Sequence, residues 1–234
     1  MSKFIEKNVV VGPFSCNCRI LVCTETREAV LIDTGDEAGK ILQAISKIEQ
    51  EVGGKLNVTH LLHTHAHLDH IGGSRGVMEG LVRVLGEGTS SPKIALHKND
   101  LELYQALKEQ GKRFGIVYDS PLPVDHLMEH EEEIKFGKQK LTVVHTPGHS
   151  PGSLCLKLHQ DTASGAKESL YTGDTLFQGN VGRTDLWGAS EEQMFQMIRE
   201  RIITHDDDTR VCPGHGMNST IGVEKRTNPY LAGL

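Results

Sequence analysis

The chain has 234 residues, of which 37% are hydrophobic, and a formal net charge of -6 at pH 7. This length and apolar content suffice for a large domain with a substantial core, and they exclude a mini-protein that depends on disulfide bonds. The excess of acidic residues argues against nucleic acid or an anionic membrane as the main partner, because both select a basic surface.

Two features of the sequence predict a cytosolic location. The N-terminal segment mixes charged residues with short apolar runs and lacks the continuous apolar stretch of a signal peptide or a membrane helix. The number of cysteines, five, is odd, and no Cys-x-x-Cys motif is present, which is typical of reduced thiols. We expect Cys16 and Cys18, two residues apart in an apolar run, to be structural residues on one face of a strand.

The first half of the chain is predicted to alternate strands and helices. Apolar runs predict strands over 17–23, 28–35 and 57–64. A helix is predicted over 40–52, because its apolar residues recur at helical spacing. The same spacing predicts an amphipathic helix over 98–110.

The second half repeats the strand pattern, with predicted strands over 153–159, 169–174 and 209–214 and a hairpin over 134–146 that turns near Gly137. A helix is predicted over 191–203, with Ser190 and Gln193 placed as a capping box. Because each half contains several strands and then a helix, we expect one domain, residues 1–234, in which helices cover layers of sheet on the outside.

Polar residues end four of the apolar runs. The first group is the segment HTHAHLDH, residues 63–70; the others are His149, Asp174 and His215, each directly preceded by a glycine. Glycine permits a tight turn that lifts the next side chain off the end of a strand. We therefore expect these side chains to meet in a shared cleft.

Backbone geometry separates the candidate metal ligands into two sets. His65 and His67 can point the same way from extended chain, whereas Asp69 and His70 are placed to open a helix. One metal would take His65, His67 and His149, and the other would take Asp69, His70 and His215, with the carboxylate of Asp174 bridging both. Three protein ligands leave a position for solvent, which is typical of a catalytic metal.

The other histidines fall into two groups. His60, His63 and His145 lie in or near strands, and we expect them to pack or to support the ligands. Five more lie in polar surroundings and are expected to face solvent: His97, His126, His130, His159 and His205. With 13 histidines in the chain some clustering arises by chance, but chance does not account for the whole pattern.

Five motifs occur in the order HTHAHLDHIGG, TPGHSPGS, TGDTLF, GRTD and CPGHG. Together they resemble the metallo-β-lactamase superfamily, most closely its glyoxalase II-like hydrolases, and DTG near residue 34 extends the likeness. The resemblance implies an α/β fold, the αββα sandwich of two mixed sheets flanked by helices, with the metals at one edge. Only a short segment follows His215, which is similar to the short bacterial members without the C-terminal glutathione-binding helical region.

The resemblance also implies an activity. We expect a metal-dependent hydrolase that cleaves a small-molecule thioester, such as S-lactoylglutathione, by attack of a metal-bridging hydroxide. Its cofactors would be two divalent metal ions, zinc first, with iron or manganese as alternatives. Asp69 would orient the attacking water and accept its proton. Arg183 would contact a substrate carboxylate, or would simply pair with Asp185.

Three other functions stay open. Persulfide dioxygenases resemble the same motifs but bind a single iron, here through His65, His149 and Asp174. A hydrolase of another ester or a lactone would use the same two-metal site. A non-catalytic protein of this fold is the third, and the complete ligand set argues against it. The sequence does not indicate an oligomeric state.

Overall fold

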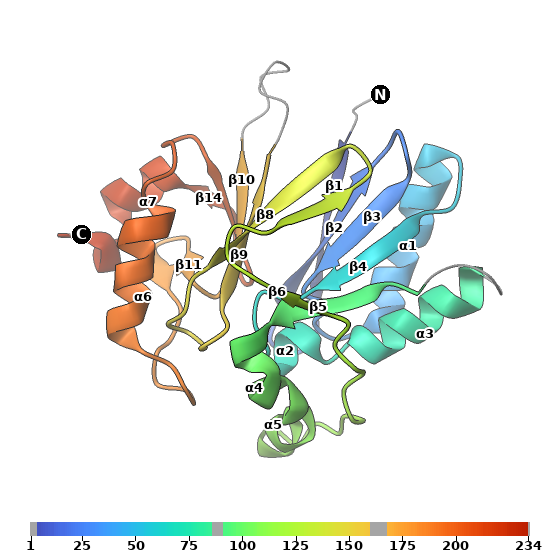
Figure 1. Ribbon diagram of the computed structural model, residues 1–234, viewed down its shortest axis with the longest axis horizontal. Helices are drawn as coiled ribbons and strands as arrows, with labels where there is room; N and C mark the ends of the chain where they lie inside the picture. The colour runs from blue at the N-terminus through green and yellow to red at the C-terminus, as the bar shows by residue number, and fades with distance from the viewer. Residues whose placement is uncertain (1–3, 86–90, 160–167, 234) are drawn as a thin grey trace.

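Two mixed β-sheets lie at the centre of the computed structural model, which describes residues 4–85, 91–159 and 168–233 (Figure 1). The first sheet is parallel from β3 to β6 and antiparallel at β1 and β2. In spatial order its strands are β1 (Phe4–Val11), β2 (Cys16–Cys23), β3 (Glu28–Ile32), β4 (Asn57–Leu62), β5 (Lys93–His97) and β6 (His126–Met128).

The second sheet is antiparallel except for the pairing of β10 with β13. In spatial order its strands are β14 (Ser219–Thr220), β13 (Arg210–Pro213), β10 (Ser169–Gly173), β9 (Leu154–Leu158), β8 (Gln139–His145) and β7 (Glu133–Phe136). The predicted hairpin is confirmed as β7 and β8. A separate small pair consists of β11 (Leu176–Phe177) and β12 (Asn180–Val181).

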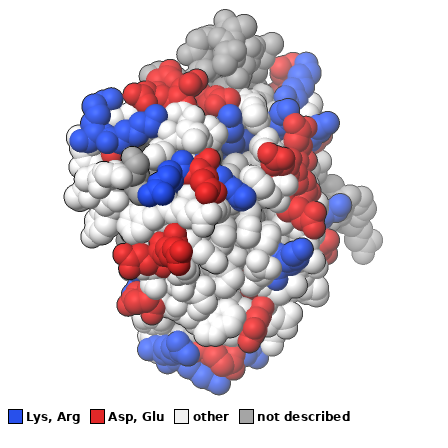
Figure 2. Space-filling model, turned by 60° about the vertical axis from the view of Figure 1, so that its left-hand side comes forward, with Lys and Arg blue, Asp and Glu red and all other residues white. Residues whose placement is uncertain are grey.

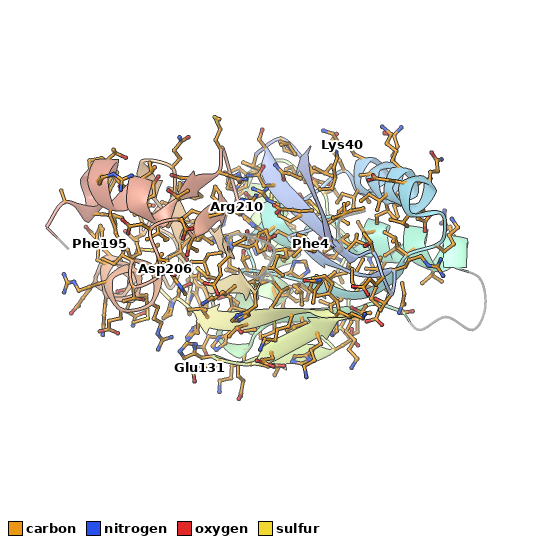
Figure 3. The ribbon with its side chains drawn as sticks, turned by 90° about the horizontal axis from the view of Figure 1, so that it is seen from above. Phe4, Lys40, Glu131, Phe195, Asp206 and Arg210 are labelled. Atoms are coloured by element: carbon orange, nitrogen blue, oxygen red, sulfur yellow. The ribbon has the colours of Figure 1, made fainter. Side chains whose placement is uncertain are left out.

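Helices cover the outer faces of both sheets. Helices α1 (Ala38–Val52) and α3 (Ser74–Leu85) lie on one side of Figure 1, and α6 (Glu191–Met197) and α7 (Ile221–Thr227) lie on the other. Seen from above, Lys40 of α1 and Phe195 of α6 are on opposite sides of the molecule (Figure 3). Three short helices lie near one end of the sheets: α2 (Leu68–Ile71), α4 (Leu101–Gln105) and α5 (Leu107–Arg113). Among the described residues, no helix combines the length and apolar character needed to cross a bilayer.

Three apolar cores hold these four layers together. The middle core packs the two sheets face to face, with Leu21 and Ile32 from the first and Phe136 and Tyr171 from the second. The two outer cores pack each sheet against its helices. Strand β2 is buried along its whole length because it has a core on each face. Since full burial of one large aliphatic side chain contributes about 1.5–3 kcal/mol, these interfaces account for the predicted αββα sandwich.

Strand β2 also confirms the prediction for the two closest cysteines. Cys16 and Cys18 both point into the core between the first sheet and its helices. All five cysteines are buried and carry free thiols.

The helix predictions are confirmed in part. Helix α1 matches its predicted range, and the Ser190 hydroxyl accepts from the Gln193 amide at 3.3 Å to cap α6, which continues as the π-helix η3 (Ile198–Ile202). The reciprocal half of the capping box is replaced, because the Ser190 amide donates to the Gly148 carbonyl at 2.8 Å. The helix predicted over 98–110 is divided at Ala106 into α4 and α5, preceded by the 3-10 turn η1 (Lys98–Asp100). A second 3-10 turn, η4 (Pro229–Leu231), follows α7.

The prediction that His97 faces solvent is wrong. His97 ends β5 and is only 6% exposed, because its ring stacks on the ring of His145 with centroids 3.9 Å apart and planes 18° apart. Its Nδ1 accepts from the Asn99 amide at 3.3 Å. The stack joins the ends of β5 and β8, and therefore joins the two sheets.

The stack predicts a loss of stability in acid. Burial, together with the charges of His145 and Lys98, lowers the pKa of His97 to about 4. The pKa is near 6.5 in the unfolded chain, so folding disfavours the protonated ring. The contribution to stability is present above pH 6.5 and is lost as the pH falls from 6.5 towards 4.

We expect wild-type protein to lose about 1–2 kcal/mol more stability between pH 7 and pH 5 than a His97→Phe variant, which keeps a stacked ring without a titrating nitrogen. Urea unfolding at both pH values measures the difference. Equal losses in the two proteins would contradict it. Metal release in acid affects both proteins alike and cancels in the comparison.

Candidate metal centre

The seven predicted ligands converge at one end of the two sheets. They form overlapping groups in which one donor atom of each residue lies within 4.8 Å of the others. The groups are His65, His67 and His149; Asp69, His70 and His215; and His65, His70 and Asp174. The first two groups are the two sets that the sequence predicts, so the cluster is compatible with a binuclear metal site.

The first set brings three imidazoles together. His67 Nδ1 lies 2.9 Å from His149 Nε2, and the His65 ring centroid lies 4.8 Å and 4.7 Å from the centroids of these two rings. His149 Nδ1 donates to the Arg183 carbonyl at 2.8 Å, which turns Nε2 towards the cluster. Fixing the outer nitrogen in this way is the usual support for a metal-binding histidine.

The second set is held in a similar way. His70 Nε2 lies 3.2 Å from His215 Nε2, and Asp69 Oδ2 lies 3.1 Å from the same His215 nitrogen. His215 Nδ1 donates to the Phe14 carbonyl at 3.0 Å. As predicted, Asp69 and His70 lie in the first turn of a helix, α2, which His67 precedes.

Asp174 lies between the two sets. Its Oδ2 is 3.6 Å from both His149 Nε2 and His215 Nε2, and its Oδ1 is 3.5 Å from His70 Nε2. Asp174 Oδ1 and His65 Nε2 are both buried and form no hydrogen bond within the described part of the chain. Buried polar atoms rarely lack partners, so these two atoms fit coordination to a cation.

The protonation states of three of the donors, His65, His67 and Asp174, also fit a metal. Burial and the neighbouring imidazoles lower the pKa of His65 well below its usual range, and the same causes lower the pKa of His67 to about 3. Against the opposing effect of burial, His70 lowers the pKa of Asp174 below its usual range. Neutral imidazoles and ionised carboxylates are the forms that bind divalent zinc, iron or manganese.

The three glycines before the later ligands act in two ways. Gly148 and Gly173 have φ of 153° and 48°, which confirms that they form turns unfavourable to other residues. Gly214 is required for space, because a Cβ there would lie 2.5 Å from Asp174 Oδ1 and 2.7 Å from His70 Cε1. Any side chain at 214 would therefore displace two ligands of the cluster.

Two buried carboxylates support the ligands, and sequence reasoning assigned neither of them a role. Asp33 accepts from His70 Nδ1 at 3.0 Å and from the Thr64 amide and hydroxyl, both at 2.8 Å. Its φ of 54° holds it in a left-handed turn after β3. The DTG motif was the available signal, since Asp33 is its first residue.

The second carboxylate, Asp100, joins two ligand-bearing loops. It accepts from the Ala66 amide at 2.9 Å on one side and from the Ser150 hydroxyl at 2.8 Å and the Gly152 amide at 2.6 Å on the other. Ala66 lies between two ligands, and Ser150 follows a third. No pattern in the sequence distinguishes Asp100, because its partners are distant in the chain.

A cleft of about 350 Å³ opens onto the cluster. His67 and Asp69 line it from the N-terminal half of the chain, and Asp174 and His215 from the C-terminal half. Apolar side chains form much of its wall: Phe14, Leu68, Leu103, Phe114, Leu186 and Trp187. The cluster is therefore accessible to a small molecule with an apolar part.

Arg183 lines this cleft, but its side chain is already paired. Its guanidinium donates to both carboxylate oxygens of Asp185, at 2.7 Å and 2.8 Å, and is 62% exposed. The part of Arg183 that supports the cluster is its carbonyl, which holds His149. Contact between its side chain and a substrate stays a prediction.

Comparison with known proteins also indicates a metallo-β-lactamase fold. Residues 11–215 match the family described as the metallo-beta-lactamase superfamily. Hydroxyacylglutathione hydrolase GloC of Haemophilus influenzae is 33% identical over 225 residues, covering 95% of this chain and 96% of that protein. The structure of the BLEG-1 B3 metallo-beta-lactamase has a TM-score of 0.80 at 32% identity, covering 98% of this chain and 100% of that one. A protein in a di-iron-bound form has a TM-score of 0.74 at 35% identity, covering 96% and 100%.

Proposed function

The chain belongs to the metallo-β-lactamase superfamily and is a metallo-hydrolase, and from this premise we propose that it hydrolyses a thioester, with S-lactoylglutathione as the first candidate. The observation that carries the proposal is the convergence of seven donors beside a partly apolar cleft. Similarity to a hydroxyacylglutathione hydrolase along almost the whole chain supports the choice of bond.

We propose that His65, His67 and His149 hold one divalent ion, that Asp69, His70 and His215 hold the other, and that Asp174 contacts both. When bound, the ions would polarise a substrate carbonyl and make a water acidic near neutral pH. Zinc is the proposed metal, and the similarity to a protein in a di-iron-bound form makes iron the first alternative, ahead of manganese.

The residues of the chain supply positioning and proton transfer. Asp69 is part of the cleft lining and its side chain is 19% exposed, so its carboxylate can orient a water and take its proton. A thiolate leaving group has a pKa near ~8.5 and departs without a strong general acid. The site therefore needs one proton acceptor, and Asp69 provides it.

Metal analysis and a substrate panel test the proposal. We expect two ions per chain, hydrolysis of S-lactoylglutathione or another acyl thioester, loss of activity with a chelator, and recovery when metal is restored. The panel includes an ester, a lactone and a β-lactam, the last because of the likeness to a B3 enzyme. Turnover of one of these without any thioester hydrolysis would contradict the proposal.

Metal content and oxygen consumption distinguish the hydrolase from the dioxygenase alternative. One iron per chain, together with oxygen consumption when glutathione persulfide is the substrate, would show that the protein is a dioxygenase and not a hydrolase. Geometry favours the hydrolase, because Asp69, His70 and His215 converge as His65, His67 and His149 do, so a second ion also has a set of three donors.

We also propose a cytosolic location and small-molecule substrates in place of nucleic acid or membrane. The five free thiols support the first, since reduced cysteines are typical of a reducing compartment. On the face in Figure 2, positive and negative side chains are interspersed, so this face offers no extended basic surface. Fractionation of cells and a nucleic-acid binding assay test these two points.

A further inference from the structure

We propose that Arg113 binds an anionic group on the substrate, and that the substrate joins this anion to an apolar segment seated on the aromatic wall of the cleft. The inference rests on the proposed function, since it names the substrate class of the same site. It commits to a thioester whose thiol part carries a carboxylate or a phosphate.

Two arginines of the described residues line the cleft, and they differ in whether they already have a partner. Arg183 is bound by Asp185 through two hydrogen bonds, so recognising a substrate anion would require it to release that partner. Arg113 ends α5, lines the same cleft and is exposed, and the described residues give it no hydrogen bond or ion pair. Its guanidinium is free to form a bidentate contact with a carboxylate or phosphate.

An exposed aromatic residue directly follows Arg113 in the chain. Phe114 lines the cleft beside Arg113 and is 58% exposed, and its ring meets Phe14 edge to face with centroids 5.2 Å apart and planes 82° apart. On the C-terminal half of the cleft lining, Trp187 is 53% exposed. Exposed aromatic side chains grouped at a cleft mark a place where an apolar ligand is buried.

The position of Arg113 is set by the segment that bears the ligands. Gln110, one turn earlier on α5, accepts from the Leu68 amide at 2.9 Å and donates to the Ala66 carbonyl at 3.0 Å. Both partners lie in the ligand segment, so α5 is fixed relative to the metal cluster. A charge at its end and an aromatic ring next to it therefore keep a defined place beside the reacting carbonyl.

The net charge of the chain also favours Arg113 as the group that binds the anion. The chain has a net charge of -6, so an anionic substrate gains nothing from the overall field of the protein and needs a local positive group. The proposed metal ions would provide one such group, but they would act on the reacting carbonyl. Arg113 provides a second that is separate from the reacting atoms.

Equilibrium binding to the metal-loaded protein tests the proposal without any turnover. The probes are S-benzyl-N-acetylcysteine with its carboxamide, and 2-(benzylthio)ethyl phosphate with 2-(benzylthio)ethanol. Each pair keeps the apolar part and differs in charge. The proteins are wild type, Arg113→Gln, and Lys112→Gln as a control. Lys112 is exposed on the same helix but lies outside the cleft lining, and its Nζ is 3.7 Å from Glu109 Oε1.

We expect wild type to bind at least one acid about tenfold more tightly than its neutral partner, which corresponds to about 1.4 kcal/mol. Arg113→Gln should abolish this preference, and Lys112→Gln should keep it. The acid with the larger ratio identifies carboxylate or phosphate as the natural group.

Equal binding of acid and neutral probe by wild type would overturn the proposal, as would the absence of binding by both acids. Persistence of the preference in Arg113→Gln would also overturn it, because the cations would then bind the anion. None of these results depends on thioester hydrolysis. The two proposals can therefore fail separately: the panel above decides the reaction, and these affinities decide Arg113.

Discussion

Replacing Asp174 by asparagine is expected to remove one of two bound ions and to lower kcat/KM for the thioester by roughly 10³-fold. Asp174 lies within 3.6 Å of imidazole nitrogens from both ligand sets, and its buried Oδ1 forms no hydrogen bond in the described structure. An amide offers one neutral oxygen in place of two charged ones, so it cannot serve both ions. Metal content per chain and steady-state kinetics measure the two effects.

Asp119→Asn is the control for this substitution, since Asp119 is an exposed carboxylate outside the cluster. It should keep two ions and the wild-type rate. Two tightly bound ions and near-normal turnover in Asp174→Asn would show that Asp174 does not bridge the metals. A loss of both ions would indicate that one set does not hold its metal alone.

Replacing Asp33 by alanine is expected to lower the stability of the metal-free protein by about 3 kcal/mol and metal affinity by about 10- to 100-fold. Asp33 is 1% exposed and accepts hydrogen bonds from His70 and from two groups of Thr64. Its removal leaves buried donors without partners and frees the His70 ring to turn. Urea unfolding in chelator and competition with a metal indicator measure the two effects.

Asp36→Ala is the matched control, three residues further along. Asp36 is partly buried and accepts two hydrogen bonds, from the Tyr118 hydroxyl and from the Glu37 amide, both at 3.0 Å, and neither partner is one of the seven predicted ligands. It should cost about 1 kcal/mol and leave metal affinity unchanged. If both variants lost metal affinity equally, the effect would come from the loop after β3 as a whole, and the role assigned to Asp33 would be wrong.

Local patterns predicted all seven residues that converge in the cluster. His149, Asp174 and His215 each follow a glycine at the end of an apolar run, and the spacing of His65, Asp69 and their neighbours separates extended chain from helix. These signals are readable because metal ligands must be specific residue types and because strand ends are marked by composition. The same regularity made the strands and α1 predictable.

Solvent exposure was less predictable than residue type. His97 has polar neighbours in sequence, yet it is buried because the end of β8 brings His145 onto its ring. The helix predicted over 98–110 is interrupted at Ala106, and after the interruption Gln110 bonds to the Leu103 carbonyl at 2.8 Å and to the ligand segment. Contacts between elements distant in the chain override local pattern in both places.

The sequence by itself determined the layered α/β fold, the type of site and the identity of its candidate ligands, because these depend on hydrophobic periodicity, glycine placement and donor chemistry. The tertiary structure alone decided which residues support and surround that site. Asp33 and Asp100 act through partners up to 52 residues away, Arg183 is paired while Arg113 has no partner among the described residues, and Phe14 contacts Phe114 in the cleft lining. Packing sets these relationships in space, and no periodicity along the chain encodes them.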